Sequence, residues 1–297
     1  MLNPNEFRHV VITPLRDESK FIPELISSIT SQTLLPSEWI IVDDNSTDNS
    51  KLIVNEFTKR FPWMSCYSIT NGGKRKRGKS IAKLFNFGLS KVDVEWDFCS
   101  KIDADMILPS DYFEKILHNF SEDNSLGIAS GSCFVVSKRG VEMDEFVFGN
   151  HTRGGLKTYR KNCFSEIGGV LEVDGWDGVD RIIAEKNGWK SRNFPKIRVE
   201  HRRKTGSYDG VLKGCYDSGS FSYCMGYYPP FFLARSIHRM LRKPYFIGGI
   251  FMILGYIAAI TSRKPKSLDK ESISFLRTEQ RSILRNWKKF AFKTNEK

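Results

Sequence analysis

The sequence predicts an α/β fold of the Rossmann type, with a mixed, mainly parallel sheet and flanking helices. Three observations lead to this prediction. Short apolar runs rich in β-branched residues alternate with helical patterns over residues 9–102, which is typical of βαβ units. Polar clusters follow the strand-like runs, where ligands bind in such sheets. The C-terminal third is strongly basic and predicts a separate helical region.

The individual elements follow from the spacing of apolar residues. A short apolar run predicts a buried strand, and apolar residues three and four apart predict a helix that packs on the sheet. Strands are expected at residues 9–14, from 38 into the turn-rich segment that ends at 48, at 65–70 and at 96–102. Helices are expected at residues 21–29, 52–61, 80–90 and 178–187. This order predicts crossovers that bring the strand ends to one edge.

Four polar clusters fall at those strand ends. They are PLRDE at 14–18, DDNSTD at 43–48, NGGKRKRGK at 71–79 and DAD at 103–105. Because the carboxyl ends of parallel strands meet at one edge of a sheet, the clusters are expected to converge on one ligand site.

The charge of the chain is unevenly distributed. The net charge is +12, yet residues 190–297 hold 23 basic and 7 acidic side chains, and the rest of the chain is slightly acidic. Such a basic region suits nucleic acid or anionic lipid. A non-enzymatic nucleic-acid-binding module would leave the acidic clusters without a purpose, so nucleic acid is not expected as a partner.

The first residues and the cysteines predict a cytoplasmic chain. MLNPNEFRHV contains no apolar run of signal-peptide length. The six cysteines are scattered, without a C-x-x-C pair or metal-ligand spacing. Reduced thiols that act as small core residues are therefore expected.

Residues Gly73–Ser80 match the phosphate-loop pattern G-x-x-x-x-G-K-[ST], and a phosphate-loop NTPase is an alternative function. Two features argue against it. The variable positions, Lys74–Arg77, are all basic, which suits a solvated loop better than a tight nest. The segment that would supply a magnesium-binding Asp, FCSKIDAD, is interrupted by Ser100 and Lys101.

Asp103 and Asp105 lie two residues apart just after a predicted strand. Their hard oxygen atoms suit Mg²⁺ or Mn²⁺, and such an ion also binds a diphosphate. The alternative without a functional role is a solvated turn. The position at the end of the fourth alternating strand favours a metal site.

Together the clusters resemble glycosyltransferase family 2, the inverting enzymes of GT-A fold. The resemblance covers residues 9–201 and, more loosely, continues to 262. It rests on Pro14-Leu15-Arg16-Asp17-Glu18, on the V-D-D-x-S-x-D element at 42–48, on Asn71 to Gly88 and on Asp103-Ala104-Asp105. The loop at 73–80 is then a family loop near the donor, lengthened by basic residues.

The resemblance implies the roles of several residues. Asp44 lies at the nucleotide base, Thr13, Pro14 and Glu18 at the base and ribose, and Lys79 at the phosphates, while for the Lys74–Arg77 run a solvated loop is equally open. The nucleotide-sugar-binding set is Thr13, Pro14, Arg16, Glu18, Asp44, Gly73, Lys79, Asp103 and Ala104. The metal set is Asp103, Asp105 and His201, for Mg²⁺ or Mn²⁺.

The catalytic base is expected in the segment that resembles the E-D-x-D-L motif of the family. Counting back from Gly188-Trp189 places the base at Asp177, with Asp180 in reserve. The chain departs from the motif here, because Trp176 stands where the family has Glu. The alternative role for Asp177 is to N-cap the helix 178–187.

Two domains are expected: a GT-A domain at 1–205, with a nucleotide-binding half at 1–108 and an acceptor half at 109–205, and a membrane-associating region at 206–297. Residues 245–261 form a 17-residue uncharged run with cations on both sides. This run is at the lower limit for spanning a bilayer. Peripheral or monotopic docking on the anionic cytoplasmic face is favoured over a buried helix.

The predicted function is metal-dependent, inverting transfer of one sugar from a nucleotide-diphosphate sugar, with UDP as the expected nucleotide. The acceptor is a saccharide or a lipid-linked molecule in surface polysaccharide or glycoconjugate biosynthesis. The Q-x-x-R-W motif of processive family members is missing from the sequence, which favours single addition.

Overall fold

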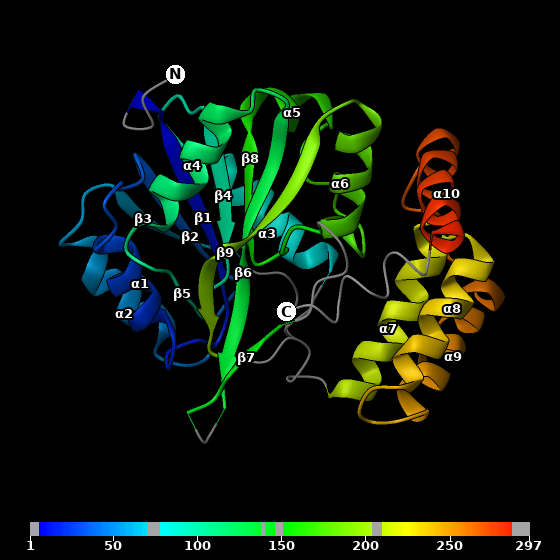
Figure 1. The fold of residues 1–297 in the computed structure, drawn as a ribbon. Coiled ribbons are helices and arrows are strands. Elements are labelled where there is room, and N and C mark those ends of the chain that lie inside the picture. Colours follow the sequence, from blue (N-terminus) through cyan, green and yellow to red (C-terminus); the bar gives the residue numbers. More distant parts are fainter. Residues whose placement is uncertain (1–5, 70–77, 138–139, 146–150, 204–209, 287–297) are drawn as a thin grey trace. The chain divides into compact units, whose positions relative to one another are not determined.

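The structure, a computed structural model, describes residues 6–69, 78–137, 140–145, 151–203 and 210–286 (Figure 1). The chain divides into two compact units, Met1–Thr205 and Gly206–Lys297. Among the described residues, none of the helices combines the length and the apolar character needed to cross a membrane.

The first unit is a sheet with helices packed against both of its faces (Figure 1). Its strands are β1 His9–Leu15, β2 Glu38–Asp43, β3 Met64–Ser68, β4 Phe98–Ile102, β5 Met106–Ile107, β6 Leu126–Val136, β7 Glu142–Asp144, β8 Leu156–Arg160 and β9 Lys190–His201. Its helices are α1 Ile22–Thr30, α2 Ser50–Thr58, α3 Lys79–Leu89, α4 Tyr112–Glu122, α5 Lys161–Glu166 and α6 Trp176–Lys186. The strands and helices predicted up to residue 102 are therefore confirmed.

The sheet has the order β3-β2-β1-β4-β8-β6-β9-β5, and β7 pairs with β6. The first four strands are parallel, β8 is antiparallel to both of its neighbours, and β9 is parallel to β6. The predicted α/β class with a mixed sheet is confirmed. Since β2, β1 and β4 are adjacent and parallel, their carboxyl ends share one edge.

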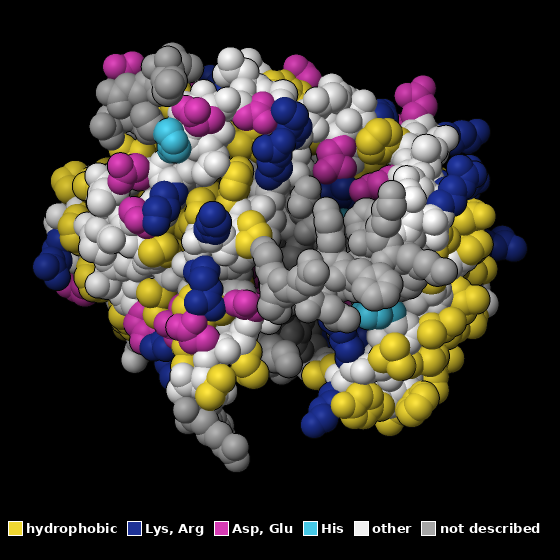
Figure 2. All heavy atoms as spheres, viewed as in Figure 1, with side chains coloured by type: hydrophobic (Ala, Val, Ile, Leu, Met, Phe, Trp, Pro, Cys, Tyr) yellow, Lys and Arg dark blue, Asp and Glu magenta, His cyan; other side chains and the backbone are white. Residues whose placement is uncertain are grey.

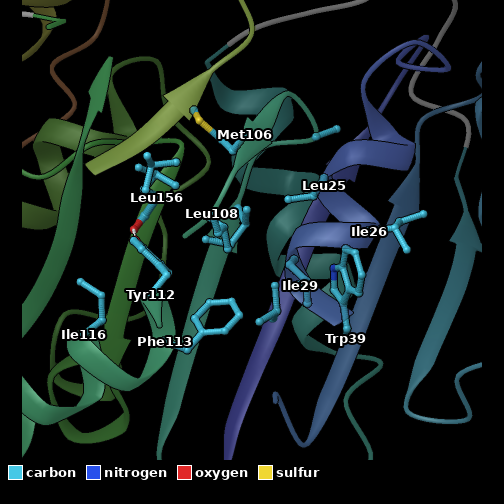
Figure 3. Packing of buried hydrophobic residues seen from close by; sticks show 14 of the residues in the cluster. Leu25, Ile26, Ile29, Trp39, Met106, Leu108, Tyr112, Phe113, Ile116 and Leu156 are labelled. Carbon is cyan, nitrogen blue, oxygen red and sulfur yellow. Dashed lines mark hydrogen bonds between the residues drawn. The ribbon is translucent and has the colours of Figure 1, made fainter. Parts of the chain in front are cut away.

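Alternation along β1 fills a core on each face of the sheet. Val11 and Leu15 belong to the cluster under α1 and α4, whereas Val10 and Ile12 belong to the cluster under α3 and α6. This is the period of two expected for a strand that is buried on both faces. Figure 3 shows the first cluster, in which α1, β2 and α4 supply interlocking side chains. The Tyr112 hydroxyl lies in this core and donates to the Leu156 carbonyl at 3.1 Å.

The second unit is helical. It consists of α7 Val211–Cys224, α8 Pro229–Met240, α9 Ile247–Thr261 and α10 Lys270–Arg285. Two glycines allow α7 and α9 to approach closely: a Cβ on Gly219 would lie 1.9 Å from the Met252 carbonyl oxygen, and one on Gly255 would lie 1.9 Å from that of Tyr216. The backbones of the two helices are thus in direct contact.

Candidate active site

Three of the four predicted polar clusters meet at the carboxyl edge of β1, β2 and β4, and most of the fourth, residues 71–79, lies outside the described residues. The loop after β1 begins at Arg16, the loop after β2 at Asp44, and the loop after β4 at Asp103. A hydrogen bond from the Asp44 amide to the Leu15 carbonyl, 2.8 Å long, joins the first two strand ends. The convergence expected from the sequence is therefore present in the structure.

The first two loops are tied together by polar contacts. The Arg16 guanidinium lies 3.3 Å from the Asp44 carboxylate, and both side chains are less than one tenth exposed. Asp17 has a left-handed φ of 52°, and its carboxylate accepts hydrogen bonds from the Thr47 amide at 2.7 Å and hydroxyl at 3.1 Å. These contacts give the predicted nucleoside-binding loops a fixed shape.

Thr13 and Pro14 lie beside this site. The Thr13 side chain is fully buried, and its hydroxyl accepts a hydrogen bond from the Trp39 indole at 3.0 Å. It therefore faces the hydrophobic core rather than the edge where a nucleotide would lie. Pro14, by contrast, is half-buried.

Glu18 and Asp105 share one cation, Arg203. The buried Glu18 carboxylate pairs with Nη2 of Arg203, and the same nitrogen lies 2.9 Å from Asp105 Oδ2. The Glu18 amide donates to Ser50 Oγ at 2.7 Å, which fixes the start of the loop. The guanidinium of Arg203 thus links the end of β9 to the loops after β1 and β4.

Asp103 lies at the mouth of the site. Its side chain is one third exposed and pairs with the buried ammonium of Lys101. A Cβ on Gly155 would lie 2.6 Å from Asp103 Oδ2. Only glycine at position 155 therefore allows this approach. Ala104, which follows, is buried.

Asp105 pairs with His201, the third predicted metal ligand. Met106 on β5 is in register with His201 on β9, and His201 Nε2 lies 3.4 Å from Asp105 Oδ2. The other ring nitrogen of His201 is 3.1 Å from Glu145 Oε2. Glu145 in turn lies 3.5 Å from Arg153. The structure thus brings the predicted histidine into the site.

The paired charges shift both pKa values. Burial opposes ionisation of Asp105, but His201 and Arg203 outweigh it and lower the pKa of Asp105 to about 2. Burial opposes protonation of His201, but Asp105 and Glu145 outweigh it and raise the pKa of His201 to about 9. At neutral pH the imidazole is therefore a cation in this structure.

The chemical types of these three side chains suit a divalent cation. Asp103, Asp105 and His201 offer two carboxylates and an imidazole, which bind Mn²⁺ or Mg²⁺. Within the part of the chain that the structure describes, no three acidic, histidine or cysteine side chains already form a metal cluster. An ion of this kind commonly uses one or two carboxylates and takes its remaining ligands from substrate phosphates. Here it would have to replace Lys101 beside Asp103 and Arg203 beside Asp105, and His201 would have to lose its proton before it could bind.

Asp177 lies in the first turn of α6, and the predicted helix start is wrong by two residues. The helix begins at Trp176, and its N-cap is Gly175 in the left-handed conformation, with φ 79°. Asp177 is therefore not the N-cap. The glycine at 175 ends the preceding loop and allows the helix to start before the acid.

Asp177 is exposed as a residue, and none of the described side chains forms an ion pair with its carboxylate. A Cβ on Gly154 would lie 2.9 Å from Asp177 Oδ2. The carboxylates of Asp177 and Asp103 therefore approach Gly154 and Gly155, the two glycines that directly precede β8. The protein around the carboxylate shields it from water and so raises its pKa, while Lys157 lowers this pKa and Asp180 raises it. The net effect is a more basic carboxylate.

Asp180, the reserve candidate, is buried and fully engaged. Its oxygens lie 2.5 Å from Lys157 Nζ, 2.5 Å from the Tyr159 hydroxyl and 2.6 Å from the Arg181 amide. A carboxylate held in this way has no face open to an acceptor. The structure therefore favours Asp177 over Asp180.

The phosphate-loop match is only partly described. Gly73 and the Lys74–Arg77 run lie outside the described residues. Lys79 begins α3, and its amide donates to Asp174 Oδ1 at 3.3 Å. In a phosphate loop this helix N-terminus would hold an anionic phosphate, but here a carboxylate lies there.

Several site residues were not found from the sequence, namely Lys101, Glu145, Gly154, Gly155, Lys157 and Arg203. Lys101 was noted only as an interruption of an apolar strand. A charged residue inside a run that must be buried on both faces could have marked it as functional. For the others no local pattern exists, because their partners are distant in the sequence.

Comparisons with known proteins show the family to which the chain belongs. The sequence pattern of glycosyl transferase family 2 matches residues 10–168, more than half of the chain. The chain therefore belongs to glycosyl transferase family 2, which confirms the resemblance and the predicted enzyme class, a glycosyltransferase. The match includes the phosphate-loop-like segment, which removes the main support for the NTPase alternative.

The chain also matches individual curated proteins. It is 26% identical over 125 residues to a poly-β-1,6-N-acetyl-D-glucosamine synthase of Staphylococcus epidermidis, covering 42% of this chain and 28% of the synthase. It is 26% identical over 132 residues to the minor teichoic acid biosynthesis protein GgaB of Bacillus subtilis, covering 43% of this chain and 14% of GgaB. The matches thus span less than a third of either relative.

Solved structures show the same fold. The mannosyltransferase PcManGT of Pyrobaculum calidifontis, in complex with GDP-Man and Mn²⁺, superposes with a TM-score of 0.57 at 16% identity, covering 98% of this chain and 86% of that one. TarS of Staphylococcus aureus, in complex with UDP-GlcNAc, gives 0.53 at 17% identity, covering 86% and 73%. The GT-A-like fold is therefore confirmed.

The raised pKa of His201 predicts a stability that depends on pH. The folded pKa of about 9 exceeds the ordinary 6.5, so the stabilisation is complete below pH 6.5 and is lost as the pH rises through 9. Without divalent metal, His201→Gln should lower the free energy of unfolding by on the order of 1 kcal/mol at pH 6 and by much less at pH 9.5. Urea denaturation at both pH values measures this. Equal losses at both would contradict it.

Proposed function

We propose that this chain transfers one sugar from a UDP-sugar, with inversion, to a saccharide or lipid-linked acceptor in surface polysaccharide or glycoconjugate biosynthesis. The single observation that carries the proposal is the position of Asp177, an exposed residue whose carboxylate lies at Gly154 while that of Asp103 lies at the neighbouring Gly155. The similar structures that hold GDP-Man with Mn²⁺ or UDP-GlcNAc support a nucleotide-sugar donor.

In this reaction the acceptor hydroxyl attacks the anomeric carbon from the face opposite the nucleotide. The bond from that carbon to the phosphate oxygen breaks, and the hydroxyl proton passes to Asp177. The raised pKa of Asp177 suits it to take this proton. A divalent metal held by Asp103, Asp105 and His201 would offset the charge that develops on the leaving nucleoside diphosphate.

The nucleoside diphosphate should bind only together with the metal. Calorimetric titration of the full chain with UDP is expected to give micromolar affinity with Mn²⁺ and about a hundredfold weaker binding without it. The Asp103→Asn/Asp105→Asn variant should lose the metal-dependent part. Metal-dependent binding of ATP or GTP in place of UDP, lost in Lys79→Ala, would instead support nucleotide hydrolysis.

Removing the base should lower the rate of sugar transfer without weakening donor binding. Asp177→Asn is nearly isosteric and is expected to lower kcat for sugar transfer by about 10²- to 10⁴-fold, because it removes general-base catalysis. UDP affinity in the presence of Mn²⁺ should stay at the wild-type value. Glu95→Gln, in an exposed ion pair with Lys161, serves as the comparison and should keep the wild-type kcat. A variant of Asp177 with wild-type kcat would eliminate this carboxylate as the base.

We also propose that the second unit docks on the anionic cytoplasmic face of a membrane. The support is an apolar face on two of its helices. On α9, residues Ile247, Ile250, Leu254, Ile257 and Ile260 are each nearly half exposed. On α8 the large apolar residues Leu233 and Ile237 are exposed, as is Leu241 just after the helix. The hydrophobic side chains gather over this unit in Figure 2.

The charges around this apolar face suit anionic lipid. Residues 218–268 contain seven Lys and Arg side chains and no acidic residue. Arg242 and Lys243 precede α9, and Arg263 and Lys264 follow it. A helix with one apolar face exposed and cations at both ends is suited to lie in the headgroup region. The exposure of these side chains supports this proposal over the alternative of a fully buried helix.

Membrane docking should depend on the apolar face and on salt. The full chain is expected to float with vesicles that contain anionic lipid and to be released in part by high salt. Ile250→Glu/Ile257→Glu should lower the bound fraction at least tenfold, because it places two charges in the apolar layer. Leu52→Glu, an exposed leucine of the first unit, is the matched control. Equal flotation of all three proteins, or none by the wild type, would contradict the proposal.

A further inference from the structure

Two lysines lie opposite each other inside the sheet, next to the proposed base. Lys101 on β4 and Lys157 on β8 are direct cross-strand partners, and their side chains are 2% and 0% exposed. Like charges at opposed positions destabilise a sheet, and a buried ammonium is costly unless it is paired. A fold alone does not need this arrangement, since apolar residues would fill the same positions.

Each lysine has its own carboxylate, and one aromatic ring lies near both. Lys101 pairs with Asp103, and Lys157 with Asp180. The ammonium groups lie 5.4 and 5.5 Å from the centroid of the Trp176 ring. An aromatic face stabilises cations at this range. The ring therefore offsets two like charges without adding a third carboxylate.

This geometry accounts for two departures from the family motif. Trp176 replaces the motif's Glu and contacts the two ammonium groups through its ring. The later acid, displaced to Asp180, pairs with Lys157 and also accepts from the Tyr159 hydroxyl. The chain thus lacks a carboxylate at 176 and has one at Asp180, one helical turn later.

Lys157 also contacts the residue proposed as the base. Its ammonium donates to the backbone carbonyl of Asp177, in the first turn of α6, while Asp180 holds the same ammonium from the next turn. The first turn of a helix frays easily unless it is tied down. Here a buried, fully paired cation ties it to the central strand β8.

We propose that Lys157, with Asp180 as its counter-ion, is a positioning residue for sugar transfer, because it fixes the first turn of α6 and thereby the place of the Asp177 carboxylate. The proposal rests on the proposed function of Asp177 as the base. Neither Lys157 nor Asp180 needs to touch a substrate. Their effect is transmitted through the backbone and through charge.

The electrostatics agree with this role. The charged and titratable groups that act on Asp177 come from β4, β8 and α6. Burial raises the pKa of Asp177, Lys157 and Lys101 lower it, and Asp180 raises it. The effect of Lys157 exceeds that of Asp180, so removing both charges together should raise this pKa further. Tyr159 stays neutral, because burial raises its pKa well above the ordinary value.

The test is the double variant Lys157→Met/Asp180→Asn in the full chain. Removing both partners avoids leaving one buried charge unpaired, which single variants would do. Its Tm and its UDP affinity with Mn²⁺ are expected to match the wild type. Its kcat should fall about 10- to 100-fold, because a small misplacement of a catalytic group has an effect of this size. The acid limb of the pH–rate profile should move to higher pH.

A second readout does not depend on activity. Titration of the Asp177 carboxyl, followed by ¹³C NMR, should show its midpoint at higher pH in the double variant than in the wild type. The matched control is Lys161→Met/Glu95→Gln, an exposed ion pair of 2.8 Å, which should change neither kcat nor this titration.

The outcomes separate this proposal from the proposed function. A double variant with wild-type kcat and an unchanged Asp177 titration would make Lys157–Asp180 a structural ion pair only and overturn the proposal. Loss of UDP binding along with kcat would overturn it too, since the pair would then serve the donor. If the wild type itself transfers no sugar, the function has failed, and the NMR titration still decides whether Lys157 sets the environment of Asp177.

Discussion

Carboxylates gathered at one edge of a parallel sheet need cations beside them, and the whole site is built around this constraint. Parallel strands bring the acidic loops after β1, β2 and β4 together, where water is largely excluded. Unpaired charges are costly in such a place. The structure supplies cations for most of them: Arg16 for Asp44, Arg203 for Glu18 and Asp105, His201 for Asp105, Lys101 for Asp103 and Lys157 for Asp180. Asp43 instead accepts from the Ser46 amide and the Ser68 hydroxyl.

The Asp177 carboxylate differs from these acids because no side chain in the described part of the chain pairs with it, and this difference affects its basicity. A carboxylate held by a close cation is a weak base, because the pair favours its ionised form. Asp177 has nearby ammonium groups that contact its backbone and its neighbour rather than its own carboxylate. It is therefore kept in place without being neutralised. The two glycines at 154 and 155 leave the space in which it and Asp103 face a substrate.

The sequence predicted most of the acids of this site together with Arg16, Lys79 and His201, but not Lys101, Lys157 or Arg203. The acids follow strand ends, which apolar periodicity reveals. Arg203 could not be predicted in this way, because its partner Glu18 lies 185 residues away along the chain. The start of α6 was also misplaced, because a left-handed Gly175 ends the loop earlier than the apolar pattern indicates. Lys157 gave no signal, since its burial depends on Asp180 and Trp176 together.

In the second unit, too, the sequence alone could not predict which side chains of an apolar segment are buried. Residues 245–261 are uncharged on every side, so composition alone cannot tell which face of the helix is buried. The positions of the glycines determine which face of α9 is buried. Gly248, Gly249 and Gly255 leave no room for a side chain against α7 and α8, and close backbone contact on that face turns the isoleucines of α9 outward. Small residues thus create the apolar surface indirectly, by fixing which side of α9 packs against its own unit.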